Sequence, residues 1–252
     1  MKSIFYTDDS KLLAGITMKD ETAPEANNMA LHVCDDPAVI VENRTSLAAL
    51  LNRSLDDLVC AQQTHSANFY RVKTADKGRG ATELGSAITD TDALYTYEPG
   101  IVLSSFAADC VPLLFSNESA GVVGAVHSGW QGTVKEVSLK LFQHLIEVEQ
   151  CRPEDFRIQI GPALSQEKFE VDEDVYLKFK ALGYADSFAY FNEETGKYHI
   201  DNQLVVKKQC ELAGIPAEAI AVDRICTYQD PSGFSYREDR QAGRHMAFIM
   251  KK

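Results

Sequence analysis

The residues of this chain best suited to chemistry are one cysteine and two histidines, Cys110, His127 and His65. Cys110 follows an apolar, strand-like segment, and His127 ends the apolar segment 122–127, 17 residues further on. The polar turn SNESAG lies between the segments 111–115 and 122–127 and would let two strands pair. Such pairing predicts that the thiol and the imidazole reach one face of a sheet.

Two imidazoles and a thiolate form a ligand set that suits zinc. Three protein ligands leave a fourth position open, which is the arrangement of a catalytic metal that activates water or polarises a substrate oxygen. Spacing alone also fits a plainer interpretation. In that case Cys110 is a small buried hydrophobe and His127 is a histidine whose ring hydrogen-bonds to a backbone carbonyl.

The elements that must position these residues are mixed in type. Short segments rich in Val, Leu and Phe predict strands over 101–106, 111–115, 122–127, 157–160, 219–226 and 245–250. Helices are predicted after Asp36-Pro37, after the T-x-x-E capping box of Thr133 and Glu136, over 172–182, and over 201–212 with Asp201 as its cap. No repeat or linker interrupts the chain, so we expect one domain over 1–252 with a mixed α/β or α+β sandwich fold.

Composition excludes several classes of function. The 252 residues carry a net charge of −12, which argues against a nucleic-acid groove or an anionic membrane surface. No apolar window approaches the length of a membrane span, and the N-terminus lacks the apolar core of a signal peptide. The six cysteines form no CxxC pair and no disulfide framework. These features predict a cytoplasmic protein with reduced thiols.

Several short motifs in order along the chain resemble one known family. They are QQTH (62–65), TDALYT (91–96), ADCVPLLF (108–115), GAVHSGWQGTV (124–134), IGPAL (160–164), FEV (169–171) and FSYRED…GRHMAFI (234–249). Together they are similar to the YfiH/laccase-domain family. Its members have been described as multicopper polyphenol oxidoreductases, peptidoglycan editing factors and purine nucleoside phosphorylases. The resemblance runs nearly from end to end.

The resemblance implies the family's single-domain layered fold and zinc bound by His65, Cys110 and His127. It also implies small-molecule partners, namely purine nucleosides and phosphate. The expected reactions are phosphorolysis of adenosine, inosine and methylthioadenosine to base plus ribose 1-phosphate, and deamination of adenosine. The oligomeric state stays open, a homodimer included.

Other residues are candidates for the remaining chemistry. Asp109 could move protons during deamination, or accept a hydrogen bond behind a ligand histidine. Phosphate could be contacted by Arg44, Arg244, Lys19 or Arg237, or by the backbone amides of 128–132. Phe169 or Phe234 could stack on a purine. The chain departs from the family pattern where Lys19, Gln131 and Glu238 stand in place of arginines. The departures at Gln131 and Glu238 remove two cations that could hold phosphate.

Three other functions remain open at this point. Cys110 and His127 could be the nucleophile and base of a thiol hydrolase or amidase linked to peptidoglycan editing. A copper-dependent polyphenol oxidase would need more ligands than the remaining histidines offer. A non-catalytic binding protein would turn over no nucleoside.

Overall fold

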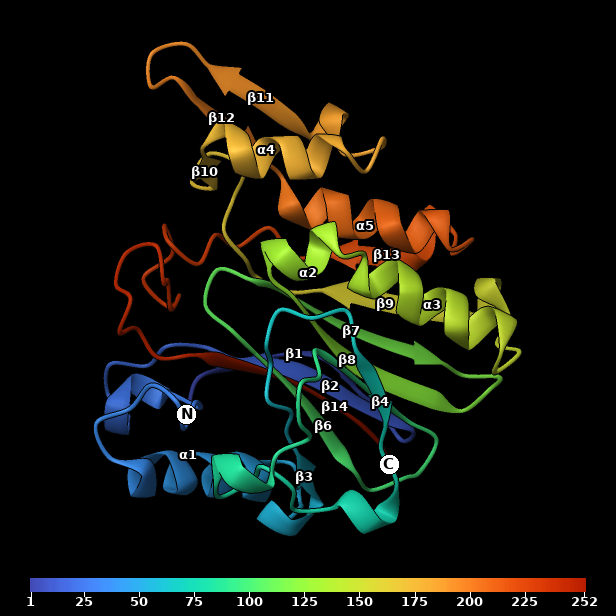
Figure 1. Ribbon diagram of the computed structural model, residues 1–252. Helices are drawn as coiled ribbons and strands as arrows, with labels where there is room; N and C mark the ends of the chain where they lie inside the picture. The colour runs from blue at the N-terminus through green and yellow to red at the C-terminus, as the bar shows by residue number, and fades with distance from the viewer.

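The computed structural model describes all residues, 1–252, and arranges them in layers of sheet and helix (Figure 1). The strands are β1 Ser3–Asp8, β2 Leu12–Thr17, β3 Leu58–Val59, β4 Phe69–Arg71, β5 Ala93–Thr96, β6 Val102–Ala107, β7 Val111–Asn117, β8 Val122–Ser128, β9 Phe156–Ile160, β10 Glu170–Val171, β11 Ala189–Asn192, β12 Lys197–Ile200, β13 Ile220–Val222 and β14 His245–Lys251. The helices are α1 Pro37–Leu50, α2 Trp130–Val134, α3 Val137–Glu147, α4 Glu173–Lys180 and α5 Asn202–Leu212. The mixed α+β class expected from the sequence is confirmed.

Two large mixed sheets pack face to face. One has the strand order β1-β2-β14-β6-β3 and the other β13-β9-β7-β8-β5-β4. Apolar side chains such as Ile16 and Leu103 from the first sheet and Leu114 and Ala125 from the second fill the space between them. Helix α1 covers the outer face of the first sheet, and α3 and α5 cover that of the second (Figure 1). A small sheet, β10-β12-β11, lies with α4 beyond α5.

The pairing of β7 with β8 is the feature that matters most for the site. The two strands are antiparallel, with Pro112 opposite His127 and Val111 opposite Ser128, as the SNESAG turn predicted. Alternation along β8 points Val122 and Val126 toward the helices and Val123 and Ala125 toward the other sheet. His127 continues the second set, so its ring faces the five-stranded sheet.

Helix α1 begins where its sequence predicts. The Asp36 side chain accepts a hydrogen bond from the Ala38 amide, 2.9 Å away, and Pro37 takes the first position. The buried positions are Ile40, Asn43, Arg44, Leu47 and Ala48. Two polar residues on the buried face are unusual, and both hydrogen-bond to backbone carbonyls of neighbouring loops.

The expected capping box at Thr133 and Glu136 is wrong. Thr133 lies inside the short helix α2, where its hydroxyl lies 2.9 Å from that of Ser128. Glu136 has a φ of 63° and separates α2 from α3. The left-handed residue turns the chain, so one predicted helix becomes two. The late strand predicted over 219–226 is also shorter, because β13 ends at Val222.

Candidate metal and nucleoside site

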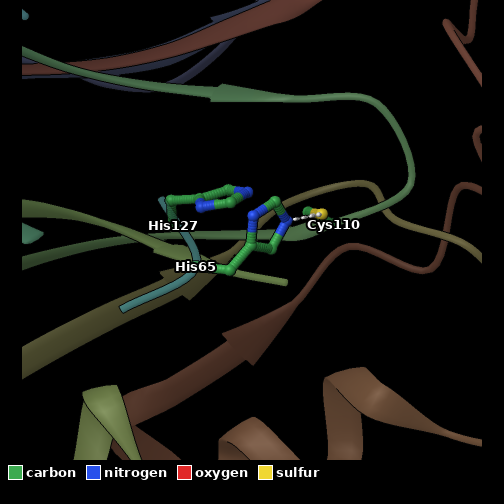
Figure 2. Close-up of side chains that lie close together, drawn as sticks. All are labelled: His65, Cys110 and His127. Carbon is green, nitrogen blue, oxygen red and sulfur yellow. Dashed lines mark hydrogen bonds between the residues drawn. The ribbon is translucent and has the colours of Figure 1, made fainter. Parts of the chain in front are cut away.

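The three candidate ligands come together at the edge where β7 begins and β8 ends. One donor atom from each of His65, Cys110 and His127 lies within 4.8 Å of the other two. Figure 2 shows the two imidazoles and the thiol converging, with Cys110 Sγ 3.7 Å from His65 Nε2. The His65 and His127 rings meet edge to face, 4.9 Å apart. The sequence separates these residues widely, and the fold places them side by side.

Local backbone geometry presents two of the side chains. His65 lies in the loop before β4 with a φ of 57°, in the left-handed region that few non-glycine residues adopt. Asp109, just before Cys110, has a φ of 79°. Strained backbone of this kind is concentrated at functional sites, where the surrounding structure holds it in place. Here strand β6 has ended at Ala107, so Asp109 and Cys110 belong to a turn between strands.

Asp92 holds both histidines, and the sequence argument had not singled it out. Its Oδ1 lies 2.8 Å from Nδ1 of His127 and accepts a hydrogen bond from the His65 amide, while Oδ2 accepts from Ser66. The Nδ1–H of His127 therefore donates to Asp92, which leaves Nε2 free to ligate. Asp92 precedes β5 and belongs to the motif TDALYT, so the motif contained the signal.

The electrostatics favour a thiolate at Cys110 and keep a proton on the ring of His127. Burial would raise the pKa of the Cys110 thiol, but the charge of His127 and hydrogen bonds from His127 and His65 lower it to about 6. Burial opposes charge on His127 as well, yet Cys110 and Asp92 raise the pKa of its ring to about 9. Burial favours the neutral acid of Asp92, and hydrogen bonds from His127 and Ser66 still lower its pKa to about 2.

The donor set passes a test of fit for a metal ion. A thiolate and two imidazole nitrogens are the ligands that zinc prefers. Gly129 keeps the space beside them clear, since a Cβ there would lie 2.3 Å from His65 Cδ2 and 2.9 Å from Cys110 Sγ. The cluster could therefore bind a metal ion.

The cluster forms part of the wall of a cavity of about 870 Å³. Small-molecule sites commonly span roughly 300–1,000 Å³. Asp109, Arg44, Arg244 and Phe169 also line this cavity, as the sequence argument proposed for substrate contacts. Lys19 does not line it and instead forms an ion pair of 2.7 Å with Glu21.

Each lining candidate has distinct partners. Asp109 accepts hydrogen bonds from the Thr227 hydroxyl and the Arg237 amide, both at 2.7 Å, and does not contact a ligand histidine. The sequence suggested that Asp109 could accept a hydrogen bond from a ligand histidine, but Asp92 has that role for His127. Phe169 packs edge to face on Phe179 at 6.3 Å.

His32 and the Trp130 side chain also line the cavity, and neither was predicted as a substrate-binding side chain. His32 begins the segment HVCDDPAVIVENR (32–44), which the family pattern also covers, but spacing gave no signal for it. Trp130 stood within the GW of GAVHSGWQGTV, and its strand-end position pointed toward the site.

Comparisons with known proteins agree with this geometry. Residues 17–252 match the model of the family described as multi-copper polyphenol oxidoreductase laccase. The chain belongs to the YfiH/laccase-domain family. Purine nucleoside phosphorylase YlmD of Bacillus subtilis is 34% identical over 255 residues, which cover 97% of this chain and 90% of the relative. Adenosine deaminase RL5, from an unknown prokaryotic organism, is 31% identical over 232 residues, covering 89% of this chain and 87% of the relative.

A solved structure shares the family's fold. The crystal structure of the Bacillus licheniformis hypothetical protein YfiH superposes with a TM-score of 0.92 at 32% sequence identity, over 98% of this chain and 99% of that one. The layered arrangement of two large sheets with covering helices is therefore that of the family. None of the helices combines the length and the apolar character that crossing a bilayer requires.

Proposed function

We propose that this protein is a zinc-dependent purine nucleoside phosphorylase with adenosine deaminase activity. The observation that carries the proposal is the His65–Cys110–His127 cluster on the wall of a nucleoside-sized cavity. The relatives named purine nucleoside phosphorylase and adenosine deaminase support the substrate class. Adenosine, inosine and methylthioadenosine are the proposed nucleosides, with phosphate as the second substrate of phosphorolysis.

Cys110, His127 and His65 would hold the zinc ion, which supplies Lewis-acid activation of water or of a substrate oxygen when bound. The protein's own contribution is to fix the ligands before substrate arrives. Asp92 accepts a hydrogen bond from His127 Nδ1 and another from the His65 amide, so one carboxylate orients both imidazoles. Such preorganisation keeps the site from rearranging during the reaction.

Asp109 is the proposed proton carrier. Deamination requires a proton on the purine ring and another on the departing amine. The Thr227 hydroxyl and the Arg237 amide hold one carboxylate oxygen each, and each oxygen keeps a further lone pair. The carboxylate is thus fixed on the cavity wall and can still accept a proton from a bound reactant.

The apolar part of the cavity suits a purine base. Trp130, Phe169, Val171 and Val175 line the cavity. Aromatic side chains prefer stacked or edge-to-face contacts with other π systems. We assign Phe169 and Trp130 to contact with the base.

A second function is favoured by one observation. The lowered pKa of Cys110 and the raised pKa of His127, backed by Asp92, give the Cys–His–Asp arrangement of a thiol hydrolase or amidase. A thiolate committed to zinc is a poor free nucleophile, so metal content separates the two functions. A multicopper oxidase needs several metal centres, whereas one such cluster of ligands is present in the chain.

The deciding experiment is chromatography of the products formed from adenosine and inosine by metal-quantified protein, with and without phosphate. Wild type should release free base only with phosphate and should form inosine from adenosine without it. Cys110→Ala should lose both the bound zinc and the turnover. Cys210→Ala is the matched control, because Cys210 is buried on α5 in the core away from the cavity. Metal-free wild type with no nucleoside turnover would instead favour the hydrolase.

A further inference from the structure

Arg44 carries a buried charge with no acidic partner. Its side chain is 2% exposed, and it donates from Nε and Nη2 to the Met29 carbonyl and from Nη1 to the Gly80 and Ala81 carbonyls, at 2.6 to 2.8 Å. No carboxylate is among these partners. Carbonyl dipoles solvate the guanidinium without neutralising it, and an uncompensated buried charge is costly. An anion bound in the cavity would compensate the buried charge of Arg44.

Arg244 is a second guanidinium on the same wall. Its side-chain hydrogen bonds, to the Ala242 and Gly243 carbonyls, both come from Nη1. The edge formed by Nε and Nη2 therefore has no partner in the protein. That planar edge is the one that binds two oxygens of a carboxylate or phosphate side by side. Arg244 also lies near Cys110 and Asp109, which are the charges that raise its pKa against the effect of burial.

His32 completes the group. Its ring lines the cavity. Burial, together with the charges of Arg244, Arg44 and His127, lowers the pKa of His32 to about 4. A neutral imidazole still offers one N–H donor. His32 therefore adds a donor to the cavity that the two arginines and the ligand cluster also line.

The charge of this wall contrasts with that of the protein. The chain has a net charge of −12, yet Arg44, Arg244 and His32 all line this one cavity. The carboxylates that line the cavity come from other elements: Asp109 precedes β7, Glu170 is in β10, and Asp172 caps α4. Of these, Asp109 already accepts two hydrogen bonds.

We propose that Arg244 and His32, backed by the buried charge of Arg44, form the subsite for a tetrahedral oxyanion, inorganic phosphate, beside the ligand cluster. The inference rests on the proposed function, in which phosphate is a substrate. It selects among the cations of the chain: Lys19 is paired with Glu21, whereas the free edge of Arg244 makes the direct contact.

The test pairs a kinetic measurement with direct binding on metal-loaded protein. Arg244→Gln should raise the KM for phosphate in inosine phosphorolysis about ten- to a hundredfold, because it removes hydrogen bonds to a charged group. The KM for inosine and the phosphate-independent deamination of adenosine should change far less. The stabilisation of wild type by phosphate over chloride at equal ionic strength should shrink in Arg244→Gln. Arg240→Gln is the control, since Arg240 is exposed on the same segment and does not line the cavity.

A second variant is needed because one of the obvious substitutions is expected to unfold the protein. Arg44→Gln would leave three carbonyls without their donor and is expected to unfold, so His32→Asn is used beside Arg244→Gln. His32→Asn should raise the KM for phosphate several-fold.

Other outcomes separate the two proposals. Phosphorolysis with an unchanged phosphate KM in both variants would overturn the subsite and leave the phosphorylase standing. Phosphate binding that needs Arg244, in a protein without phosphorolysis, would keep the subsite and overturn the phosphorylase. Binding of AMP that needs Arg244, without binding of inorganic phosphate, would overturn the assignment to inorganic phosphate.

Discussion

Asp92 and His127 are joined across neighbouring strands by two hydrogen bonds. The carboxylate accepts from His127 Nδ1 at 2.8 Å, and the Asp92 carbonyl accepts from the His127 amide at 2.7 Å. Ala93 of β5 pairs with Val126 of β8, so the register puts Asp92 opposite His127. The same carboxylate accepts hydrogen bonds from the backbone amides of residues 64–66, so Asp92 positions both candidate ligands, His65 and His127.

Asp92→Asn should weaken zinc binding about 10- to 100-fold while the protein stays folded. The Asn side chain has the shape of Asp but no charge. Its NH₂ group replaces one of the two carboxylate oxygens and cannot accept the hydrogen bonds that this oxygen accepts in wild type. Competition with a chromophoric chelator measures the affinity directly. Asp90→Asn is the control, because Asp90 lies on the same segment and contacts Thr64 and Asn68 rather than a ligand ring. Equal zinc affinity in wild type and Asp92→Asn would contradict the assigned role.

Gly129→Ala should abolish stoichiometric metal binding and nucleoside turnover. Gly129 has a φ of −66°, which any residue tolerates, so the effect is steric. An added Cβ would lie 2.3 Å from His65 Cδ2 and 2.9 Å from Cys110 Sγ, and the ring and thiol must move apart. Metal analysis and turnover are the measurements. Gly85→Ala, where a Cβ would meet nothing within 4 Å, should behave like wild type.

Phe169→Leu should raise the KM for inosine about two- to tenfold and leave the phosphate KM and the zinc content unchanged. The substitution keeps an apolar side chain but removes the aromatic face, whose contact with another π system is worth about 0.5–1.5 kcal/mol. Steady-state kinetics with each substrate varied in turn would show it. Phe191→Leu serves for comparison, since Phe191 is 50% exposed on β11 and does not line the cavity. A raised phosphate KM instead would place Phe169 elsewhere in the reaction.

His245 should make the protein less stable in mild acid. Its Nδ1 donates to the Thr17 carbonyl at 2.8 Å, and its Nε2 accepts from the Phe234 amide at 2.7 Å, so the buried ring is held neutral. Burial is the main reason that the pKa of His245 falls to about 4.

The sign of the effect follows from proton uptake. The unfolded chain binds a proton near pH 6.5 and the folded protein only near pH 4, so stability is lost as the pH falls through that window. The contribution of His245 to this loss should be about 2 kcal/mol at pH 5. Urea unfolding at pH 7 and pH 5 measures it. His245→Gln should be less stable at pH 7 and show a smaller difference between the two pH values; an unchanged difference would exclude His245 as the source.

Local signals and short motifs were enough to predict several parts of this protein. The turn SNESAG between two apolar segments specified the β7–β8 hairpin, because period-two alternation and a short turn fix a register. Asp36-Pro37 specified the start of α1, since a cap and a fixed φ act within a few residues. The motifs around His65, Cys110 and His127 predicted a candidate ligand set, and the fold brings these three residues together.

Features that depend on contacts between distant segments could not be predicted from the sequence. Asp92 reaches His127 through strand pairing, and the break at Glu136 reflects packing that outweighs a local capping signal. Lys19 and Arg244 are both basic residues in family motifs, yet one pairs with Glu21 at the surface and the other lines the cavity. Their difference lies in burial and in the groups that surround each charge, and a linear pattern does not encode either quantity.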